Sequence, residues 1–293
     1  MKRLKSDESI DRRTFVKAIG VSTAGIAIGC STPNVNGGQQ SRTLDRIGIQ
    51  LYTLRQDMER DFDGTLASVA AIGYKEVETA GYFGRSPADV RAALDRLGLT
   101  APAAHVGPPD VLRKDWEKTI ENSKIIGHRY LIVPFIPEEQ RRTLDDYRRL
   151  ADLFNTAGET AQKAGVRFGY HNHDFEFVAL EGKLPYDVLL ERTQPALVAM
   201  ELDLFWITKG GQEPLAYFDR HKGRFEAVHV KDMETPPTGK MVAVGRGKID
   251  FARIFAQREK AGILHFFVEH DNPEAPALGS AKTSYDYLRQ LKF

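Results

Sequence analysis

The chain has 293 residues, 42% of them hydrophobic and 28% charged, which is typical of a globular protein and argues against disorder throughout. Its 41 basic and 40 acidic side chains give a formal net charge of +1, so the basic excess of most nucleic-acid-binding proteins is missing. The single cysteine, Cys30, excludes an internal disulfide framework and a cysteine-rich metal site.

Residues 1–30 are expected to be an export signal. Arg12 and Arg13 precede the apolar run "AIGVSTAGIAIG", which is too short for a permanent membrane span, and this pattern resembles a twin-arginine signal. The run ends in "AIGC", which resembles a lipoprotein processing site with Cys30 as the lipidated residue, although Ala27 stands where leucine is usual. Cleavage by ordinary signal peptidase is the alternative. We therefore expect an exported protein, periplasmic or held on the membrane only by a lipid anchor.

Residues 31–44, "STPNVNGGQQSRTL", are polar and without periodicity, which predicts a linker. In residues 45–293, short apolar runs predict strands that begin some 25 to 40 residues apart along the chain. The expected strands are residues 46–51, 74–79, 99–105, 129–135, 166–171, 196–203, 225–230 and 264–269.

Helical spacing of apolar residues is found between these strands. The clearest helical segments are residues 62–73, 86–98, 144–165 and 250–262, and each closes on a glycine suited to a left-handed cap. Eight strand–helix units in about 250 residues predict a single-domain (β/α)₈ TIM barrel of the α/β class. A doubly wound open sheet is the alternative, but no G-x-G-x-x-G follows the first strand.

Polar side chains gather at the carboxyl ends of the expected strands, where such barrels carry their active sites. The ends of strands three, five, six, seven and eight carry His105; His171 and His173; Glu201 and Asp203; His229 and Lys231; Glu269 and His270. Because residues i and i+2 share a strand face, one member of each pair is expected to point to the barrel axis and the other to lean along the rim. Glu76 and Glu78 lie in the second strand, with Glu76 expected as a rim charge.

These residue types predict a metal site. Imidazole together with carboxylate suits Mn²⁺, Zn²⁺, Fe²⁺ or Co²⁺, and the carboxylates also keep Mg²⁺ open. A single strand-end histidine is more often a hydrogen-bonded structural residue than a ligand, so the prediction depends on convergence of several strands.

Six segments, "IGIQLYTLR", "GYKEVE", "GYHNHDFEF", "ELDLFW", "VHVKD" and "FVEHD", resemble the sugar phosphate isomerase/epimerase family of xylose-isomerase-like barrels over residues 45–293. The resemblance implies a divalent metal ion held by Asp203, His229 and Glu269, and Mn²⁺ is the ion expected first. The family's strand-five glutamate is replaced by His171, which becomes the fourth ligand, with His173 as its competitor. Arg246 departs from the family in the same way, because it stands where that family has glutamate.

The resemblance further implies an isomerase or epimerase that moves a proton next to a carbonyl, with Glu269, His171 and Lys231 as catalytic residues. The alternative is a lyase that performs β-elimination on a 3-keto-glycoside or an inosose-like substrate. The expected substrate-binding residues are His105, His173, Glu78 and Trp206. Aromatic residues near the mouth, Tyr52, Tyr82, Phe83, Phe205 and Trp206, are expected to stack on a sugar ring or to pack in the core.

The expected partner is a small carbohydrate, and a neutral one, because the chain has no glycine-rich phosphate cradle and phosphorylated sugars are scarce outside the cytoplasm. A barrel endonuclease fits poorly, since it requires a richer histidine cluster and a basic face. A non-catalytic sugar-binding protein stays open. A homo-oligomer is compatible with the sequence, which does not set the oligomeric state.

Overall fold

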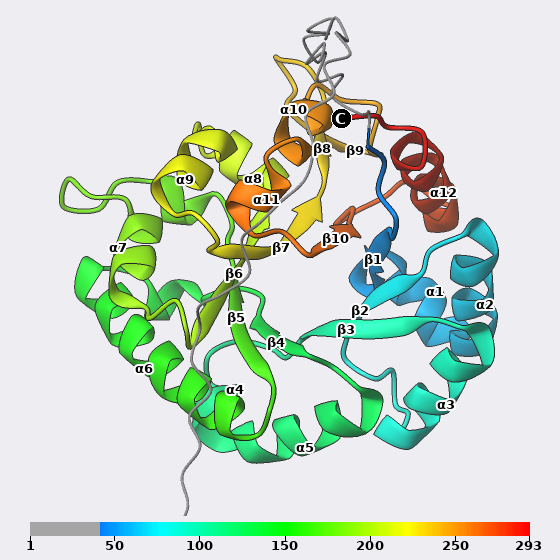
Figure 1. The fold of residues 1–293 in the computed structure, drawn as a ribbon, viewed down its shortest axis with the longest axis horizontal. Helices are drawn as coiled ribbons and strands as arrows, with labels where there is room; N and C mark the ends of the chain where they lie inside the picture. Colours follow the sequence, from blue (N-terminus) through cyan, green and yellow to red (C-terminus); the bar gives the residue numbers. More distant parts are fainter. Residues whose placement is uncertain (1–41) are drawn as a thin grey trace, which may run out of the picture. The chain divides into compact units, whose positions relative to one another are not determined.

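The structure is a computed structural model that describes residues 42–293. Eight parallel strands close into a barrel in the order β1-β10-β7-β6-β5-β4-β3-β2, with the helices outside it (Figure 1). The barrel strands are β1 Gly48–Gln50, β2 Glu76–Ala80, β3 Thr100–His105, β4 Tyr130–Val133, β5 Arg167–His171, β6 Val198–Asp203, β7 Phe225–Val230 and β10 His265–Val268. All eight expected strands and the single-domain TIM barrel are thereby confirmed.

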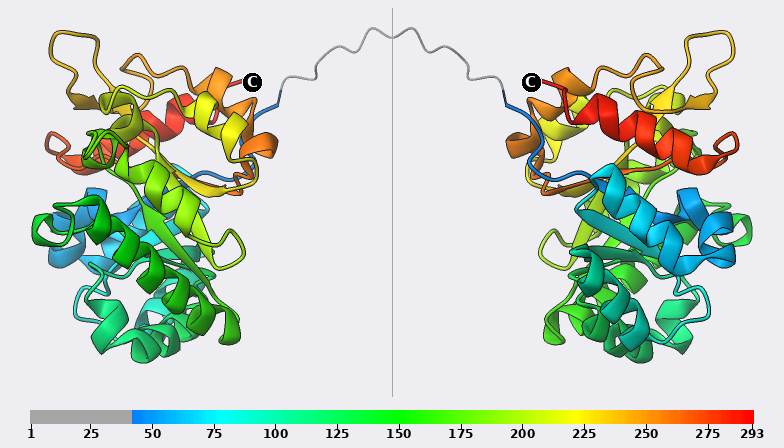
Figure 2. Two further views of the ribbon diagram at one scale, coloured as in Figure 1. Left: turned by 90° about the vertical axis from the view of Figure 1, so that its left-hand side faces the viewer. Right: turned by 90° about the vertical axis from the view of Figure 1, so that its right-hand side faces the viewer.

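The helices pack against the outer surface of the barrel, as the side views in Figure 2 show. They are α1 Arg55–Arg60, α2 Phe62–Ile72, α3 Pro87–Leu97, α4 Val111–Lys114, α5 Trp116–Ile126, α6 Leu144–Lys163, α7 Pro185–Arg192, α8 Leu204–Lys209, α9 Pro214–Arg220, α10 Phe251–Phe255, α11 Arg258–Ala261 and α12 Ala277–Leu288. Short 3₁₀ turns η1, η2 and η3 lie at Leu51–Leu54, Glu138–Gln140 and Phe175–Phe177, and β8 Asp232–Met233 pairs with β9 Met241–Val242 in a small hairpin. No helix in the described part of the chain is long and apolar enough to cross a membrane.

Local sequence signals set several helix ends. The Ser86 hydroxyl accepts a hydrogen bond from the Asp89 backbone N–H at the start of α3, and Gly98 ends that helix with a φ of 64°. The expected helix over residues 250–262 is wrong in one respect, because it is divided into α10 and α11. Phe255 ends α10 in contact with Phe266 and Phe293, and the chain then turns before α11.

Strand parity decides which side chains enter the barrel. Side chains that face outward, such as Leu131 and Val228, join the large core between strands and helices. A small separate cluster, Ala103, Tyr130, Ile132, Ala199, Ala227 and Phe267, alternates with them and fills the interior. The same inward parity continues from Ala199 to Glu201 and Asp203, and it places the polar residues above this apolar plug.

The predicted signal over residues 1–30, most of the predicted 31–44 linker, and Cys30 lie outside the described residues.

Candidate active site

A cavity of about 670 Å³ opens at the carboxyl ends of the barrel strands. Six of the predicted site residues line it: His105, His171, His173, Trp206, Lys231 and Glu269. Asp203 lies below its surface in contact with His171 and Lys231. The volume falls within the range of roughly 300–1,000 Å³ that is usual for small-molecule sites.

Four buried donors converge at the base of this cavity in what we call the upper group: His171, Asp203, His229 and Glu269. Their ligand atoms all lie within 4.8 Å of one another. His171 Nε2 is 3.1 Å from Asp203 Oδ2, and His229 Nδ1 is 2.7 Å from Glu269 Oε2 and 3.8 Å from Asp203 Oδ2. This is the predicted ligand set, with His171 rather than His173 as its strand-five member.

The hydrogen bonds of the two histidines fit a metal at the upper group. His171 Nδ1 lies 3.0 Å from the Pro134 carbonyl, to which a proton on this nitrogen donates, so the Nε2 lone pair faces Asp203. His229 Nε2 lies 2.7 Å from Glu78 Oε2, which leaves Nδ1 facing the upper group. Within residues 42–293, His229 Nδ1 is buried, and the polar groups that it faces are the Glu269 and Asp203 carboxylates of the upper group. Metal-ligating histidines show this arrangement, in which the outer nitrogen is held by an acceptor.

Below the upper group lies a second set, which we call the lower group: Glu78, His105, Glu201 and the Nε2 side of His229. His105 Nε2 is 2.9 Å from Glu201 Oε2, and His229 Nε2 is 3.2 Å from the same oxygen. Glu78 is fully buried and also accepts a hydrogen bond of 2.8 Å from Gln50 Nε2. Glu78 therefore holds His229 in place and does not line the cavity, in contrast to its expected substrate-binding position.

Lys231 is the cationic partner of three carboxylates in the site. Its Nζ lies 3.1 Å from Asp203 Oδ2, 2.6 Å from Glu269 Oε2 and 2.7 Å from Asp271 Oδ1. Burial by itself lowers the pKa of Lys231, but these three carboxylates together raise it well above its ordinary value. Burial raises the pKa of Glu269, yet Lys231 and His229 hold that pKa well below its usual range. The site thus presents the Lys231 ammonium ion beside the ionised carboxylate of Glu269.

His173 forms part of the cavity wall. Its ring is stacked on Phe175 with centroids 5.3 Å apart, and it lies 5.3 Å from the Trp206 ring. Burial, followed by the nearby charge of His171 and Lys231, lowers the pKa of His173 well below its ordinary value. His173 is therefore a neutral imidazole, and among the described residues its buried Nδ1 has no hydrogen-bond partner.

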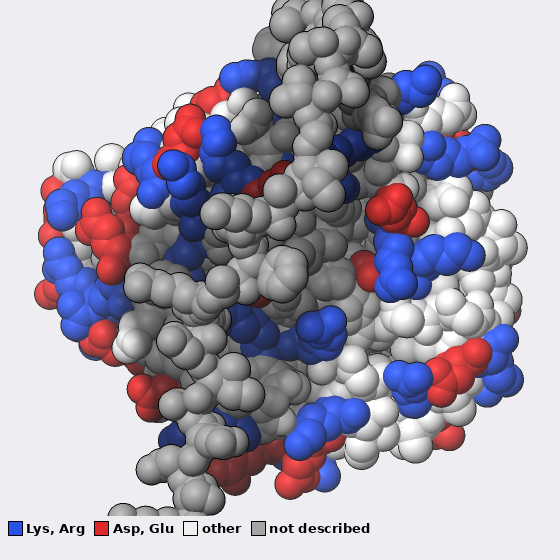
Figure 3. Space-filling view, viewed as in Figure 1, with Lys and Arg blue, Asp and Glu red and all other residues white. Residues whose placement is uncertain are grey.

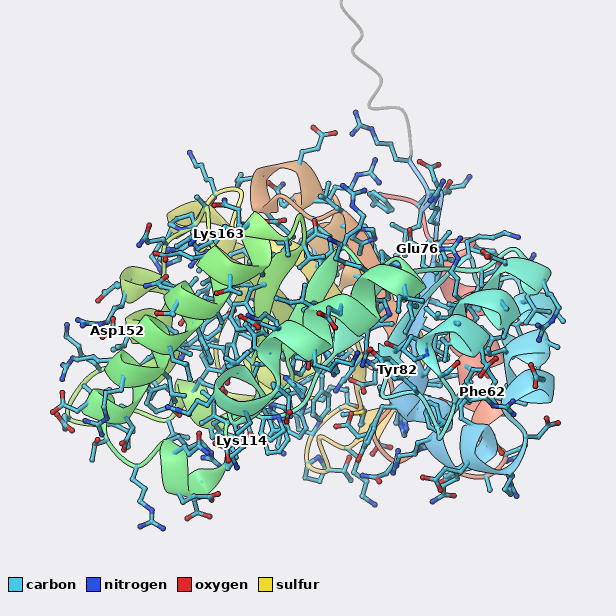
Figure 4. All side chains as sticks on the ribbon, turned by 90° about the horizontal axis from the view of Figure 1, so that it is seen from below. Phe62, Glu76, Tyr82, Lys114, Asp152 and Lys163 are labelled. Carbon is cyan, nitrogen blue, oxygen red and sulfur yellow. The ribbon has the colours of Figure 1, made fainter. Side chains whose placement is uncertain are left out.

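Two expectations about placement are wrong. Both Glu201 and Asp203, and likewise both His229 and Lys231, point inward, because i and i+2 share the interior face and lie in successive layers. Glu76 is not a rim charge: it is buried at the opposite end of the barrel, 2.8 Å from His265 Nδ1. Figure 4 shows Glu76 at the same end as Lys163, away from Tyr82.

Of the five aromatic residues, Tyr52 and Trp206 line the cavity. Tyr82 and Phe83 instead pack against the core, where the Phe83 ring lies 6.3 Å from that of Phe62. On the face drawn in Figure 3, acidic and basic side chains are intermingled over the surface that is not covered.

Two partners in the site were missed in the sequence. Asp271 lies two positions after Glu269 and therefore points to the same side of the chain, as the spacing in "FVEHD" indicates. Gln50, whose side-chain amide donates to Glu78, is the last residue of β1, so a polar residue at a strand end was again the available signal.

The loop after β5 contains a buried carboxyl that makes stability depend on pH. Glu176 accepts a hydrogen bond from the Tyr170 hydroxyl and one of 2.8 Å from the His173 backbone N–H, while burial raises its pKa to about 7. The unfolded chain ionises near pH 4.5, so folding stability is fully present below about pH 4.5 and falls as the pH rises through about 7. We expect Glu176→Gln to be more stable than wild type at pH 8 by up to roughly 3 kcal/mol, and to lose that advantage at pH 4.5.

Urea unfolding at both pH values measures this difference. Glu191→Gln on the exposed face of α7 is the matched control, for which no pH-dependent gain is expected. An identical free energy of unfolding for Glu176→Gln and wild type at pH 8 would contradict the assignment.

The sequence and the fold match known proteins. The model of the xylose isomerase-like TIM barrel family matches residues 66–291. An inosose dehydratase of Geobacillus kaustophilus (strain HTA426) is 26% identical over 272 residues, which cover 78% of this chain and 87% of that enzyme. A sugar phosphate isomerase/epimerase structure from Parabacteroides distasonis ATCC 8503 is similar with a TM-score of 0.74 at 26% identity, over 84% of this chain and 94% of that one. The zinc-bound IOLI protein shares the fold, with a TM-score of 0.67 at 16% identity over 82% of this chain and 95% of that one. The chain therefore belongs to the xylose isomerase-like TIM barrel family.

Proposed function

We propose that this protein is a divalent-metal-dependent lyase that eliminates water or an alcohol from a keto-sugar or keto-cyclitol. The observation that carries the proposal is the meeting, in one cavity, of a metal-binding set with the His173 imidazole and the Lys231 amine. The similarity to inosose dehydratases supports the choice of elimination.

Each group is assigned a role from its place in the cavity. The neutral imidazole of His173 takes the proton from the carbon next to the carbonyl, and the electron pair of that C–H bond forms the new carbon–carbon double bond. The carbon–oxygen bond on the next carbon breaks, and Lys231 delivers a proton to the departing oxygen. His171, Asp203, His229 and Glu269 would hold the metal, which when bound polarises the substrate carbonyl. No oxidant or reductant is required.

An isomerase or epimerase is the second candidate. The similarity to the Parabacteroides protein favours it, and it needs the same proton abstraction next to a carbonyl. It differs in returning the proton to carbon instead of expelling an oxygen. Such enzymes use two opposed glutamates, and His171 stands where the family has one of them. The isomerase is therefore the second candidate.

The test is NMR of the metal-loaded protein with a panel of keto-cyclitols, ketoses and 3-keto-glycosides in D₂O. Elimination yields an enone, or its tautomer, that has lost water or the alcohol. Isomerisation yields a product of the same composition that carries deuterium. The His171→Ala/His229→Ala variant, expected to have lost about one ion per chain by elemental analysis, serves as the inactive control.

A wild-type protein that binds no divalent ion and exchanges no carbon-bound proton across this panel would overturn the enzyme proposal. That result would favour the non-catalytic sugar-binding alternative.

A further inference from the structure

A second hollow of about 420 Å³ adjoins the main cavity. Trp206, Asp271 and Asn272 border both, so the two spaces meet along these three residues. The other walls come from α8, which follows β6, and from the hairpin between β8 and β9, whose loop protrudes from the barrel (Figure 2). We call these spaces the inner cavity and the outer hollow.

The walls of the outer hollow combine the partly exposed Trp206 ring, over which Lys209 Nζ lies 4.6 Å from the ring centre, with the buried Phe205 ring and with polar groups. The Phe205 and Trp206 rings meet edge to face, with centroids 4.9 Å apart. Thr238 and Lys240 are contributed by the hairpin loop, and the Asp271 backbone N–H donates to Met241 Sδ at 3.2 Å, which ties the hairpin to the boundary. Aromatic surface flanked by hydroxyl and amine groups is a surface to which a sugar ring binds.

Two polar atoms at this hollow lack a partner in the described chain. Trp206 Nε1 and His270 Nδ1 are both buried and make no hydrogen bond within residues 42–293. An unpaired buried polar atom costs stability, so a small ring movement that brings Trp206 Nε1 to a ligand hydroxyl would be favoured. Trp206 is the important one, because it stands on the border of both spaces.

The charges of the outer hollow favour a neutral ligand. Lys209 is paired with Asp174 at 3.3 Å, and Asp271 is paired with Lys231 at 2.7 Å. Of the two lysines that line the hollow, only Lys240 has no acidic partner within 4.0 Å among the described residues. A phosphate or sulfate group would gain little from one exposed ammonium ion.

We propose that the outer hollow binds a second sugar ring, so that the substrates of this protein are two-ring glycosides rather than free monosaccharides. The inference rests on the proposed function, which assigns the first ring to the inner cavity. The bond between the two rings would cross the border at Trp206 and Asp271.

Calorimetric titration of the metal-loaded protein tests this without requiring turnover. The probes are cellobiose, lactose and their 3-keto forms, each compared with the methyl glycoside of its first ring. We expect the better disaccharide to bind at least about tenfold more tightly than its methyl glycoside. In Lys240→Ala and Thr238→Val the ratio of the two affinities is expected to fall to about two or three. Lys222→Ala, just before the amino end of β7, keeps the wild-type ratio.

Equal affinity for one-ring and two-ring probes in the wild-type protein would overturn the inference and leave the proposed lyase intact. Glucose 6-phosphate binding more tightly than every disaccharide would also overturn it, in favour of an anion site. A disaccharide preference that depends on Lys240, in a protein without turnover, would support the outer site while the lyase proposal fails.

Discussion

Glu269→Gln is expected to lower kcat by at least about 1,000-fold and to weaken metal retention. Glutamine keeps the size of the side chain but removes the charge that lies 2.7 Å from His229 Nδ1 and 2.6 Å from Lys231 Nζ. The variant then has one anionic donor fewer in the upper group, and Lys231 loses one of its three carboxylate partners. Elemental analysis and turnover of the same preparation measure both effects.

Glu191→Gln is the matched control, because it makes the same chemical change on an exposed position of α7. It should change neither metal content nor turnover. Full activity of the Glu269 variant would remove Glu269 from the site and with it the proposed ligand set.

Lys231→Met is expected to lower kcat by roughly 10²- to 10⁴-fold while the metal stays bound. Methionine fills a similar volume but carries no proton to deliver, and loss of the ammonium ion leaves the Asp203 and Glu269 carboxylates without that cationic partner. That change favours a divalent cation at the upper group. The combination of lost turnover with retained metal therefore distinguishes a proton donor from a ligand.

Substrates with a better leaving group test the proposed proton transfer from Lys231 more directly. If Lys231 protonates the departing oxygen, the variant should recover most on a glycoside whose aglycone has a low pKa. Lys222→Met, at an exposed position, is the control for the substitution itself. Loss of metal together with turnover in Lys231→Met would show instead that Lys231 only maintains the structure of the site.

Much of the fold could be predicted because each strand carries its own apolar run and lies at a regular interval from the next. Residues 225–230 form β7 with the predicted bounds, and the other strands differ from prediction by a few residues at their ends. The 250–262 segment shows the limit of this reasoning. Its apolar spacing is helical throughout, but the first helix ends at Phe255, whose ring is buried against Phe266 and Phe293 from other elements.

The site could likewise be predicted only in part. Convergence of His171, Asp203, His229 and Glu269 could be expected, since all carboxyl ends of parallel strands meet at one side of a barrel. The export signal and the lipidation of Cys30 stay predictions, because they concern residues outside the described part of the chain.

By itself the sequence determined the barrel and the end at which the polar residues meet, because apolar runs and strand ends are local properties, while the four expected donors followed from the family resemblance. Only the tertiary structure decided how deep in the barrel each polar side chain lies and which groups it contacts. It placed Glu78 beneath His229, paired Lys231 with Asp271, and sent Glu76 to the opposite end. These outcomes depend on the stagger between neighbouring strands, which sets the layer that each side chain occupies and cannot be read from one strand alone.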